Sequence, residues 1–166
     1  MATLREIQDP LKERYREEPE AAKVTLSASG RLGEGVTCSL STGRAMAEAG
    51  LHPASGGDGT QLCSGDMLLE ALVACAGVTL RAVATSLDID VRGGTVKAEG
   101  DLDFRGTLAV DKDVNVGFTD IRLTFDLETD ASADELATLQ RLTERYCVVL
   151  QTITSPPRIA TATVTS

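Results

Sequence analysis

Two cysteines, Cys75 and Cys147, are the reactive side chains that the sequence places in the most protected surroundings, because each lies well inside an apolar, helix-like segment. A thiol performs redox chemistry as its thiolate, which needs a cation close by, and a sulfenic acid formed on it needs a second thiol to resolve it. Arg31, directly after Gly30, and the acids at the start of the first of these segments are candidates to supply and orient that cation. The opposing interpretation is that both cysteines are core residues, because free cysteine packs as a small hydrophobe.

Other kinds of chemistry have little support in the residue types. The chain has one histidine, His52, in a segment rich in glycine and proline, and no two of its four cysteines are spaced as C-x-x-C. These features argue against a metal site and against a Ser-His-Asp or Cys-His catalytic device. A glycine cluster at 55–60 can cradle phosphate, but no G-K-[ST] motif accompanies it, so a loop that leads into a helix is favoured. We expect neither a metal nor an organic cofactor.

The segment around Cys75 predicts a long, buried helix that continues to Ser86. Its apolar residues occupy every side of a helix over 67–80, as in a helix at the centre of an assembly. Small residues surround Cys75, so another backbone can approach closely there: Ala71, Ala74, Ala76 and Gly77.

A second helix is predicted after the capping box formed by Ser132 and Glu135, with apolar residues at helical spacing to about Leu150. Cys147 lies roughly 100° from the centre of this apolar stripe, at its margin.

Alternation of apolar and polar residues predicts the strands. Residues 23–29 and 36–40 predict a hairpin punctuated by Gly30 and Gly33, residues 91–104 and 114–127 predict two long antiparallel strands, and residues 158–165 predict a last strand, whereas residues 44–60 are irregular. The order β-β-α-β-β-α-β is an α+β plan. We expect one domain over 22–166, preceded by a charged arm over 1–21 with a short helix from Asp9 to about Glu18.

Composition and charge narrow the partners and the compartment. The chain has 166 residues, of which 42% are hydrophobic, so one domain can form its core without disulfides or metals. The net charge of -9 and the five scattered aromatic residues argue against nucleic acid and anionic membranes as partners. No export signal is recognised, and the most apolar run contains Glu70, so we expect a cytoplasmic protein that spans no membrane, with reduced cysteines.

Three runs of residues, in this order and spacing, resemble the OsmC/Ohr family. They are SGGDGT at 55–60, SGDMLLEALVAC at 64–75, and ERYC at 144–147 followed by two valines. Members of the family carry a P-x-E-L-L-x-A-A-L-x-x-C helix and a second helix with a cysteine near its end. The similarity covers 22–165, and the surrounding β pattern agrees with it.

The resemblance implies an OsmC-like α+β fold, in which antiparallel sheets wrap around two long central helices and two chains intertwine into a homodimer. It also implies a thiol-dependent peroxidase. Cys75 matches the cysteine that attacks the O–O bond of a hydroperoxide and becomes a sulfenic acid, and Cys147 matches the cysteine that captures it as an intrachain disulfide. Arg31 matches the arginine that stabilises the thiolate, and the family's reductant is a dithiol such as a dihydrolipoyl group or a small thiol.

The sequence departs from the family pattern at the acid that holds this arginine. Nine residues before Cys75 stands Asp66 in place of a glutamate, and Glu70, one turn further along, is a second candidate. The shorter aspartate side chain implies a looser arginine clamp. The proline often found after the second cysteine is replaced by Val148.

Two alternatives remain open. Cys63 stands three residues before Asp66, near enough to the predicted helix to compete as the resolving thiol, whereas Cys38 is expected in a strand core. The same fold can also serve as a binding module, in which a hydrophobic pocket holds a fatty or aromatic ligand with little or no peroxidase activity.

Overall fold

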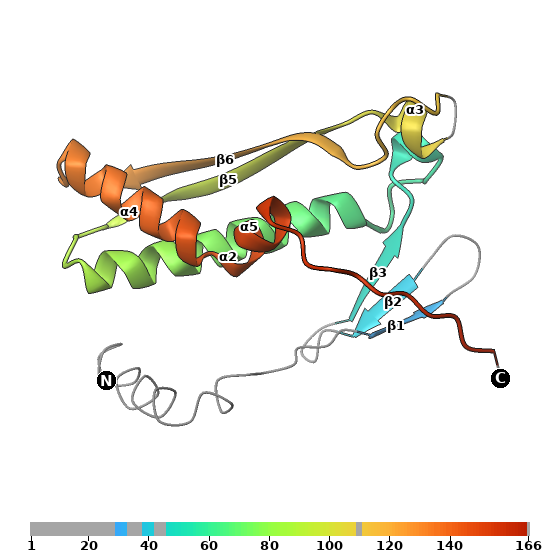
Figure 1. Cartoon of the computed structure of the whole chain (residues 1–166), viewed down its shortest axis with the longest axis horizontal. Coiled ribbons are helices and arrows are strands. Elements are labelled where there is room, and N and C mark those ends of the chain that lie inside the picture. Colours follow the sequence, from blue (N-terminus) through green and yellow to red (C-terminus); the bar gives the residue numbers. More distant parts are fainter. Residues whose placement is uncertain (1–28, 33–37, 42–45, 109–110, 166) are drawn as a thin grey trace. The chain divides into compact units, whose positions relative to one another are not determined.

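The computed structural model describes residues 29–32, 38–41, 46–108 and 111–165 (Figure 1). The arm predicted at 1–21 lies outside these residues, as does most of the strand predicted at 23–29. The chain forms two compact units, one of Met1–Glu70 with Lys97–Thr124 and one of Ala71–Val96 with Phe125–Ser166.

The first unit contains a four-stranded sheet with the order β1-β2-β3-β4. Its strands are β1 (Ser29–Leu32), β2 (Cys38–Ser41), β3 (Met46–Gly50) and β4 (Leu62–Cys63). The predicted hairpin is present as the antiparallel pair β1–β2, but Gly30, predicted to mark its turn, lies within β1 opposite Leu40. β3 was missed because Met-Ala-Glu-Ala-Gly has no β-branched residue; it forms because β2 offers it an edge for antiparallel pairing.

The single histidine has a structural role at the short 3-10 helix η2 (Pro53–Ser55). The ring nitrogen Nδ1 of His52 accepts a hydrogen bond from the Ala54 N–H at 3.0 Å, which caps η2. The His52 ring also stacks on Phe104, with 5.1 Å between the ring centroids. The hydrogen bond and the ring stack of His52 therefore both stabilise the local structure of this loop.

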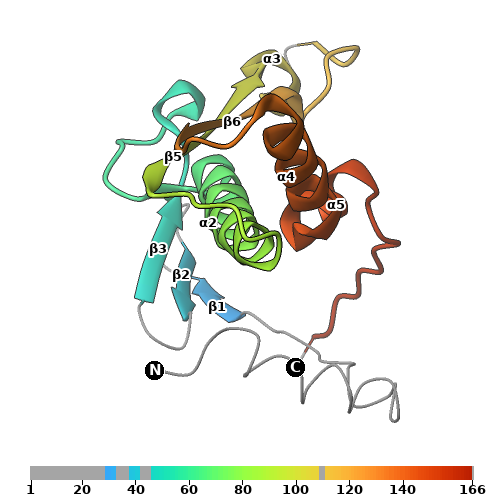
Figure 2. The ribbon, with the colours of Figure 1, turned by 90° about the vertical axis from the view of Figure 1, so that its left-hand side faces the viewer.

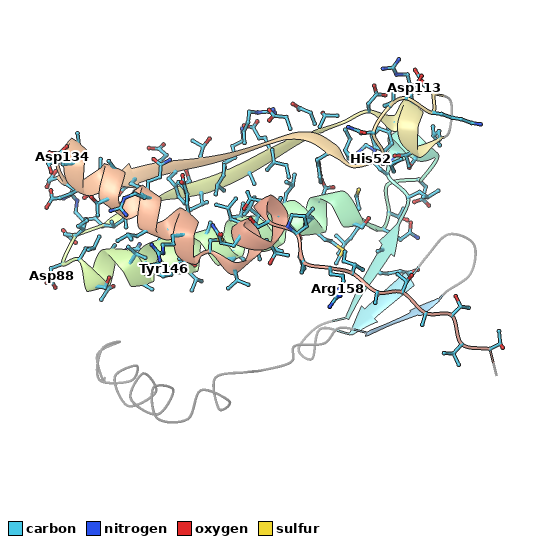
Figure 3. All side chains as sticks on the ribbon, viewed as in Figure 1. His52, Asp88, Asp113, Asp134, Tyr146 and Arg158 are labelled. Atoms are coloured by element: carbon cyan, nitrogen blue, oxygen red, sulfur yellow. The ribbon has the colours of Figure 1, made fainter. Side chains whose placement is uncertain are left out.

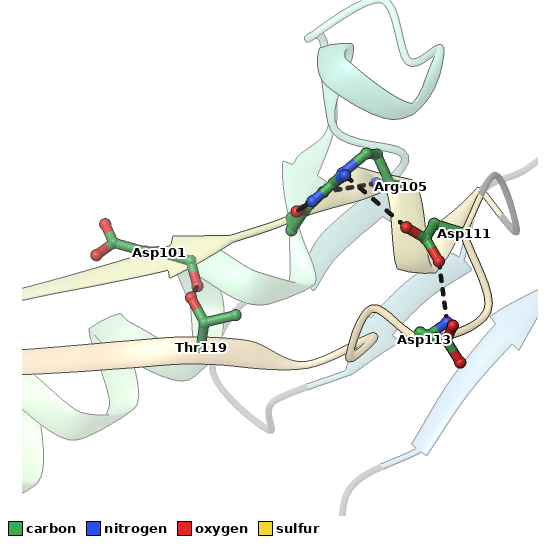
Figure 4. Close-up of polar contacts among 6 residues, drawn as sticks. Asp101, Arg105, Asp111, Asp113 and Thr119 are labelled. Carbon is green, nitrogen blue, oxygen red and sulfur yellow. Dashed lines mark hydrogen bonds and ion pairs between the residues drawn. The ribbon is translucent and has the colours of Figure 1, made fainter.

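The two long predicted strands are β5 (Gly93–Leu102) and β6 (Phe118–Glu128), which form a two-stranded sheet. The Arg92 N–H donates to the Glu128 carbonyl at 2.9 Å, and the Thr119 hydroxyl donates to the Asp101 carbonyl at 3.1 Å (Figure 4). Residue numbers thus rise along β5 as they fall along β6, which is the predicted antiparallel arrangement.

The connection between β5 and β6 holds a helical turn that the sequence analysis did not predict, α3 (Phe104–Thr107). The Asp103 carboxylate accepts the Arg105 N–H at 3.0 Å and so caps this turn. The Arg105 guanidinium forms ion pairs with Asp103 at 2.6 Å and Asp111 at 3.8 Å (Figure 4). Short polar contacts, rather than hydrophobic periodicity, therefore fix this turn.

The second unit is built on α2 (Ser64–Ser86) from Ala71 onward, the helix predicted around Cys75. Its buried residues follow one stripe: Leu72, Ala76, Leu80, Val83 and Ala84. Leu80, Val83 and Ala84 form the core with Val91 and with Leu139 of α4 (Ala133–Tyr146). Figure 2 shows α4 beside α2. The predicted capping box is confirmed, because the Ser132 N–H donates to the Glu135 carboxylate at 2.8 Å and the Glu135 N–H donates to the Ser132 hydroxyl at 3.4 Å.

The C-terminal part of the chain differs from the sequence prediction in two places. The second long helix ends at Tyr146 rather than near Leu150, and a separate helix, α5 (Val148–Thr154), follows it. Residues 158–165 have no regular secondary structure and are exposed. An alternating pattern forms a strand only where another strand offers an edge, and within the described residues none pairs with this segment.

Only part of α2 is covered by the residues that the structure describes. Ala71, Ala74 and Val78 share a stripe of the helix and are exposed, Val78 to 73%. By length and by its mean hydropathy of 1.8 this helix would also suit a membrane span, a property that it shares with the core helices of globular proteins. The helix that the sequence predicts to be apolar on every side thus has one buried side and one exposed apolar side.

We expect a homodimer that persists at low micromolar concentration, because an uncovered apolar stripe favours association. Val78→Lys is expected to shift the mass measured by light scattering toward the monomer. Val116→Lys, which charges another exposed valine in a loop, 63% exposed, is the matched control and is expected to leave the mass unchanged. A monomeric wild type whose melting temperature is independent of concentration contradicts the prediction.

Candidate active site

The second unit brings Cys75 and Cys147 into contact. Cys75 lies in the middle of α2 and is half-buried, and Cys147 lies between α4 and α5 with no exposed surface. Both cysteines are free thiols, and each is close enough to the other to shift its pKa. A pair of neighbouring thiols is the arrangement from which a disulfide forms, provided that their Cβ atoms can approach to about 4 Å.

Cys147 is buried because the chain breaks at this residue. Its φ of -72° and ψ of 105° are extended, its N–H donates to the Thr143 carbonyl, and its carbonyl accepts the Gln151 N–H, both at 2.9 Å. Cys147 therefore ends α4 and begins α5. The helical wheel assumes one continuous helix, so its prediction that Cys147 lies at the margin of the apolar stripe is wrong.

Hydrogen bonds favour the thiolate form of Cys75. Burial raises the pKa of its thiol, but hydrogen bonds outweigh burial and hold the pKa below its ordinary value. The donors, in decreasing effect, are the Val149 N–H, the Cys147 thiol, the Thr79 hydroxyl and the Val148 N–H. Cys75 is therefore the thiol of the pair that ionises first.

The same surroundings keep Cys147 protonated. Burial raises the pKa of the Cys147 thiol, and the neighbouring Cys75 raises it further through its hydrogen bond and its charge. The Leu150 and Val149 N–H groups act in the opposite direction and do not outweigh burial. The pair thus divides into a thiol that ionises more readily, Cys75, and a thiol that stays protonated to higher pH, Cys147.

A comparison with models of protein families finds a match to this chain. The family model described as OsmC-like protein matches residues 57–162, more than half of the chain, including both cysteines of the pair. This chain belongs to the OsmC-like family. A comparison with curated protein sequences finds no match.

Solved structures share the OsmC-like α+β fold at low sequence identity. An OsmC-like protein from Mycoplasma pneumoniae has a TM-score of 0.68 at 15% identity, over 81% of this chain and 90% of that one. An organic hydroperoxide resistance protein from Elizabethkingia anophelis has a TM-score of 0.65 at 15% identity, over 81% and 91%. One from Legionella pneumophila has a TM-score of 0.63 at 18% identity, over 81% and 92%. The OsmC-like α+β fold predicted from the sequence is confirmed, although β4 pairs with β3 in parallel rather than antiparallel.

The residue after Cys147 has a specific consequence in this OsmC-like chain. A proline at that position would have no N–H to donate. Val148 has one, and its hydrogen bond is among those that lower the pKa of Cys75. The departure from the family pattern noted in the sequence thus adds a donor beside the thiol.

The described residues do not bring the predicted arginine clamp together. Arg31 lies in β1 opposite Ser39, and its side chain lies outside what the structure describes. Asp66 and Glu70 are exposed on α2, and neither forms an ion pair with a described cation. At 100° per residue, Asp66 is about 180° and Glu70 about 140° around a helix from Cys75, so neither faces the thiol directly. Their contact with Arg31 stays a prediction.

The remaining cysteines of the OsmC-like chain lie on strands. Cys63 ends β4 and is a half-buried free thiol, and Cys38 begins β2. Other groups that lower the pKa of Cys75 were not predicted from the sequence, namely the Thr79 hydroxyl and the N–H groups of Val148 and Val149. The spacing of four residues between Cys75 and Thr79 indicates that the Thr79 side chain lies on the same side of the helix as Cys75. The N–H groups depend on the helix break at Cys147, which no local pattern predicts.

A second hydroxyl lies one turn before Cys147. Thr143 is 1% exposed, and among the described residues its Oγ1 has no hydrogen-bond partner. A buried polar group without a partner costs about 1–3 kcal/mol. We therefore expect Thr143→Val to raise the free energy of unfolding by about 1 kcal/mol in urea denaturation.

Thr152→Val is the matched control for this substitution, because the exposed Thr152 hydroxyl donates to the Val148 carbonyl at 2.8 Å. We expect its effect on stability to stay within about 0.5 kcal/mol. Destabilisation by Thr143→Val would show that the hydroxyl has a partner in solution.

Proposed function

We propose that this OsmC-like protein is a thiol-dependent peroxidase that reduces hydroperoxides through Cys75 and Cys147. The observation that carries the proposal is the contact between a thiol whose pKa is lowered and a buried thiol whose pKa is raised. Membership of the OsmC-like family and a fold shared with organic hydroperoxide resistance proteins support a redox function on hydroperoxides.

In the first step the Cys75 thiolate attacks the outer oxygen of the hydroperoxide. The S–O bond forms as the O–O bond breaks, so the sulfur is oxidised by two electrons and the peroxide is reduced. The leaving alkoxide takes up one proton and departs as an alcohol, or as water when the substrate is hydrogen peroxide. Cys75 becomes a sulfenic acid.

In the second step Cys147 resolves the sulfenic acid. Its sulfur attacks the Cys75 sulfur, the S–S bond forms as the S–O bond breaks, and the hydroxyl leaves with the Cys147 proton as water. A dithiol such as a dihydrolipoyl group then reduces the disulfide by two thiol exchanges and is itself oxidised to a disulfide. The cycle consumes one hydroperoxide and one dithiol and needs no metal.

Arg31 has the charge that this cycle would use. Its guanidinium keeps its charge in a water-poor site, where a lysine would lose a proton more readily. In the proposal it stabilises the Cys75 thiolate, and Asp66 or Glu70 holds it in place. The hydrogen bonds around Cys75 act beside this charge.

The test is a peroxidase assay with the reduced full chain. Hydrogen peroxide, cumene hydroperoxide and a lipid hydroperoxide are each offered with dihydrolipoamide and with a monothiol. We expect multiple turnovers with at least one pair, none in Cys75→Ser, and no oxidation of the dithiol without peroxide. Thiol loss that is equally fast in Cys75→Ser contradicts the proposal.

One observation favours a binding module as a second candidate. The second unit has a cavity of about 260 Å³ whose apolar walls come from Leu80, Phe125, Leu127, Leu136 and Leu139, with Thr129 and Gln140 also lining it. A cavity of this kind suits a small apolar ligand. Titration with a fluorescent medium-chain fatty acid tests it, and saturable binding in a protein without peroxidase activity favours the module over the enzyme.

A further inference from the structure

The break between α4 and α5 removes backbone hydrogen bonds that a continuous helix would make. In such a helix each N–H donates to the carbonyl four residues earlier. The structure has two of these bonds at the break, from the Cys147 N–H to Thr143 and from the Gln151 N–H to Cys147. Among the described residues it lacks the three between them: Val148 to Glu144, Val149 to Arg145 and Leu150 to Tyr146. Three carbonyls at the end of α4 are thus left without a backbone donor.

One of these carbonyls has a side-chain donor in place of the backbone. The Nε2 of Gln151 donates to the Glu144 carbonyl at 2.9 Å, although the two residues are seven apart in the sequence. The backbone N–H of Gln151 also donates, to the Cys147 carbonyl at 2.9 Å. Gln151 therefore holds the chain at two points of the break, the end of α4 through its side chain and Cys147 through its backbone.

The residue after Cys147 does not force this break. Val148, at the first position of α5, has an N–H that could donate to the Glu144 carbonyl, whereas a proline has none. The alternative is a helix that continues past Tyr146, as the apolar periodicity predicts, with Cys147 at the margin of its apolar stripe. In the structure Cys147 is extended and has no exposed surface. A contact that favours the broken form therefore decides where the Cys147 thiol lies.

We propose that Gln151 is a positioning residue, whose side-chain amide binds the Glu144 carbonyl and so holds the helix break that keeps Cys147 buried. This bond belongs to the broken form only. In a continuous helix Gln151 would lie about 10 Å along the axis from Glu144, and its amide would not reach that carbonyl. A contact made in one form only shifts the equilibrium toward that form. The inference rests on the proposed peroxidase function for its biological meaning, because Cys147 is there the resolving thiol.

The test is the alkylation of Cys147 by iodoacetamide in the reduced full chain, followed by peptide mass spectrometry. A thiol with no exposed surface reacts through local opening, so its rate measures the population of the open form. Gln151→Met keeps a side chain of similar length without the donor. We expect this variant to raise the alkylation rate of Cys147 about fivefold, the effect of losing one neutral hydrogen bond of ordinary strength.

Two further variants separate this role from a general loss of stability. Gln140→Met is the matched control, because the Gln140 amide, also exposed, donates to the Glu144 carboxylate at 2.9 Å within α4. It is expected to leave the alkylation rate of Cys147 unchanged. Val148→Pro, added to Gln151→Met, is expected to restore the slow rate. Proline cannot supply the N–H that a continuous helix needs, and it suits the first position of a helix such as α5.

Any of three results would overturn the inference: an unchanged alkylation rate of Cys147 in folded Gln151→Met, an equal rise in Gln140→Met, or no recovery in the folded double variant. Gln151→Ala replaces Gln151→Met if that variant does not fold. A protein that shows the change in alkylation without reducing peroxides supports the role of Gln151 and rejects the peroxidase. One that reduces peroxides without the change rejects the role of Gln151 alone.

Discussion

Cys147→Ser is expected to reduce one equivalent of hydroperoxide per chain and then to stop, leaving a sulfenic acid on Cys75. Only the attacking thiol takes part in O–O cleavage, so the first step survives the substitution. The second step needs a sulfur to form the disulfide, and a serine hydroxyl cannot provide it. Steady-state turnover should therefore fall by at least about a hundredfold, because an intramolecular thiol in contact acts at a very high effective concentration.

Trapping with dimedone and intact-mass measurement give the readout. The wild type should show a disulfide after one equivalent of peroxide, and Cys147→Ser should show a dimedone adduct on Cys75. Cys75→Ser should show neither. Equal single-turnover peroxide consumption in Cys75→Ser would mean that another group performs the cleavage.

Cys63 can be tested in the same experiment. If Cys147→Ser still turns over and a Cys63→Ser, Cys147→Ser double variant does not, Cys63 is a resolving thiol. The described residues favour Cys147, since it is close enough to Cys75 for each thiol to shift the pKa of the other. The double variant should therefore behave as Cys147→Ser does.

The sequence was sufficient wherever one segment carries the whole signal. The helix around Cys75, the capping box at Ser132 and the long strands β5 and β6 depend on periodicity or on a cap within a few residues, and all are present. The strand predicted at 158–165 has an equally regular pattern but is not a strand, because pairing depends on an edge supplied by another segment.

The candidate site likewise has features that one segment predicts and features that depend on contacts between segments. The spacing of Cys75 within its helix and the family resemblance indicated both thiols, and the structure brings them into contact. The burial of Cys147 depends on a break between two helices, and the donors Val148 and Val149 follow from that break. Backbone N–H groups are common to almost every residue type, so no residue pattern distinguishes those that face a thiol.

In the reduced wild type, alkylation is expected to modify Cys75 at a lower pH than Cys147. Hydrogen bonds lower the pKa of Cys75 despite its burial, whereas burial and the neighbouring Cys75 raise the pKa of Cys147. Between the two pKa values Cys75 is a thiolate and Cys147 a thiol, so iodoacetamide reacts selectively with Cys75. Mass spectrometry after a short pulse at each pH measures both rates.

Arg31→Ala tests whether a cation adds to these hydrogen bonds. We expect it to raise the pKa of Cys75 by about one unit, because a nearby opposite charge favours the thiolate. The N–H, thiol and hydroxyl donors remain in this variant, so Cys75 should still ionise before Cys147. Asp66→Asn and Glu70→Gln should have smaller effects, since the cation is then present but less firmly held. A wild-type pKa that is not lowered and does not respond to Arg31 would favour two core cysteines and the binding module.

The two pKa shifts also predict how stability depends on pH. A thiol whose pKa is lowered by folding contributes stability that is present above its unfolded value, about 8.5, and is lost as the pH falls through the folded value. The contribution of Cys75 to the stability of the reduced protein should therefore grow as the pH rises from its folded pKa to its unfolded pKa. Cys147, with a raised pKa, contributes stability that is present below the unfolded value and is lost as the pH rises through the folded value. The oxidised protein is the control, because neither sulfur of a disulfide titrates, and a difference in stability between the two forms that is constant from pH 6 to 10 would contradict both shifts.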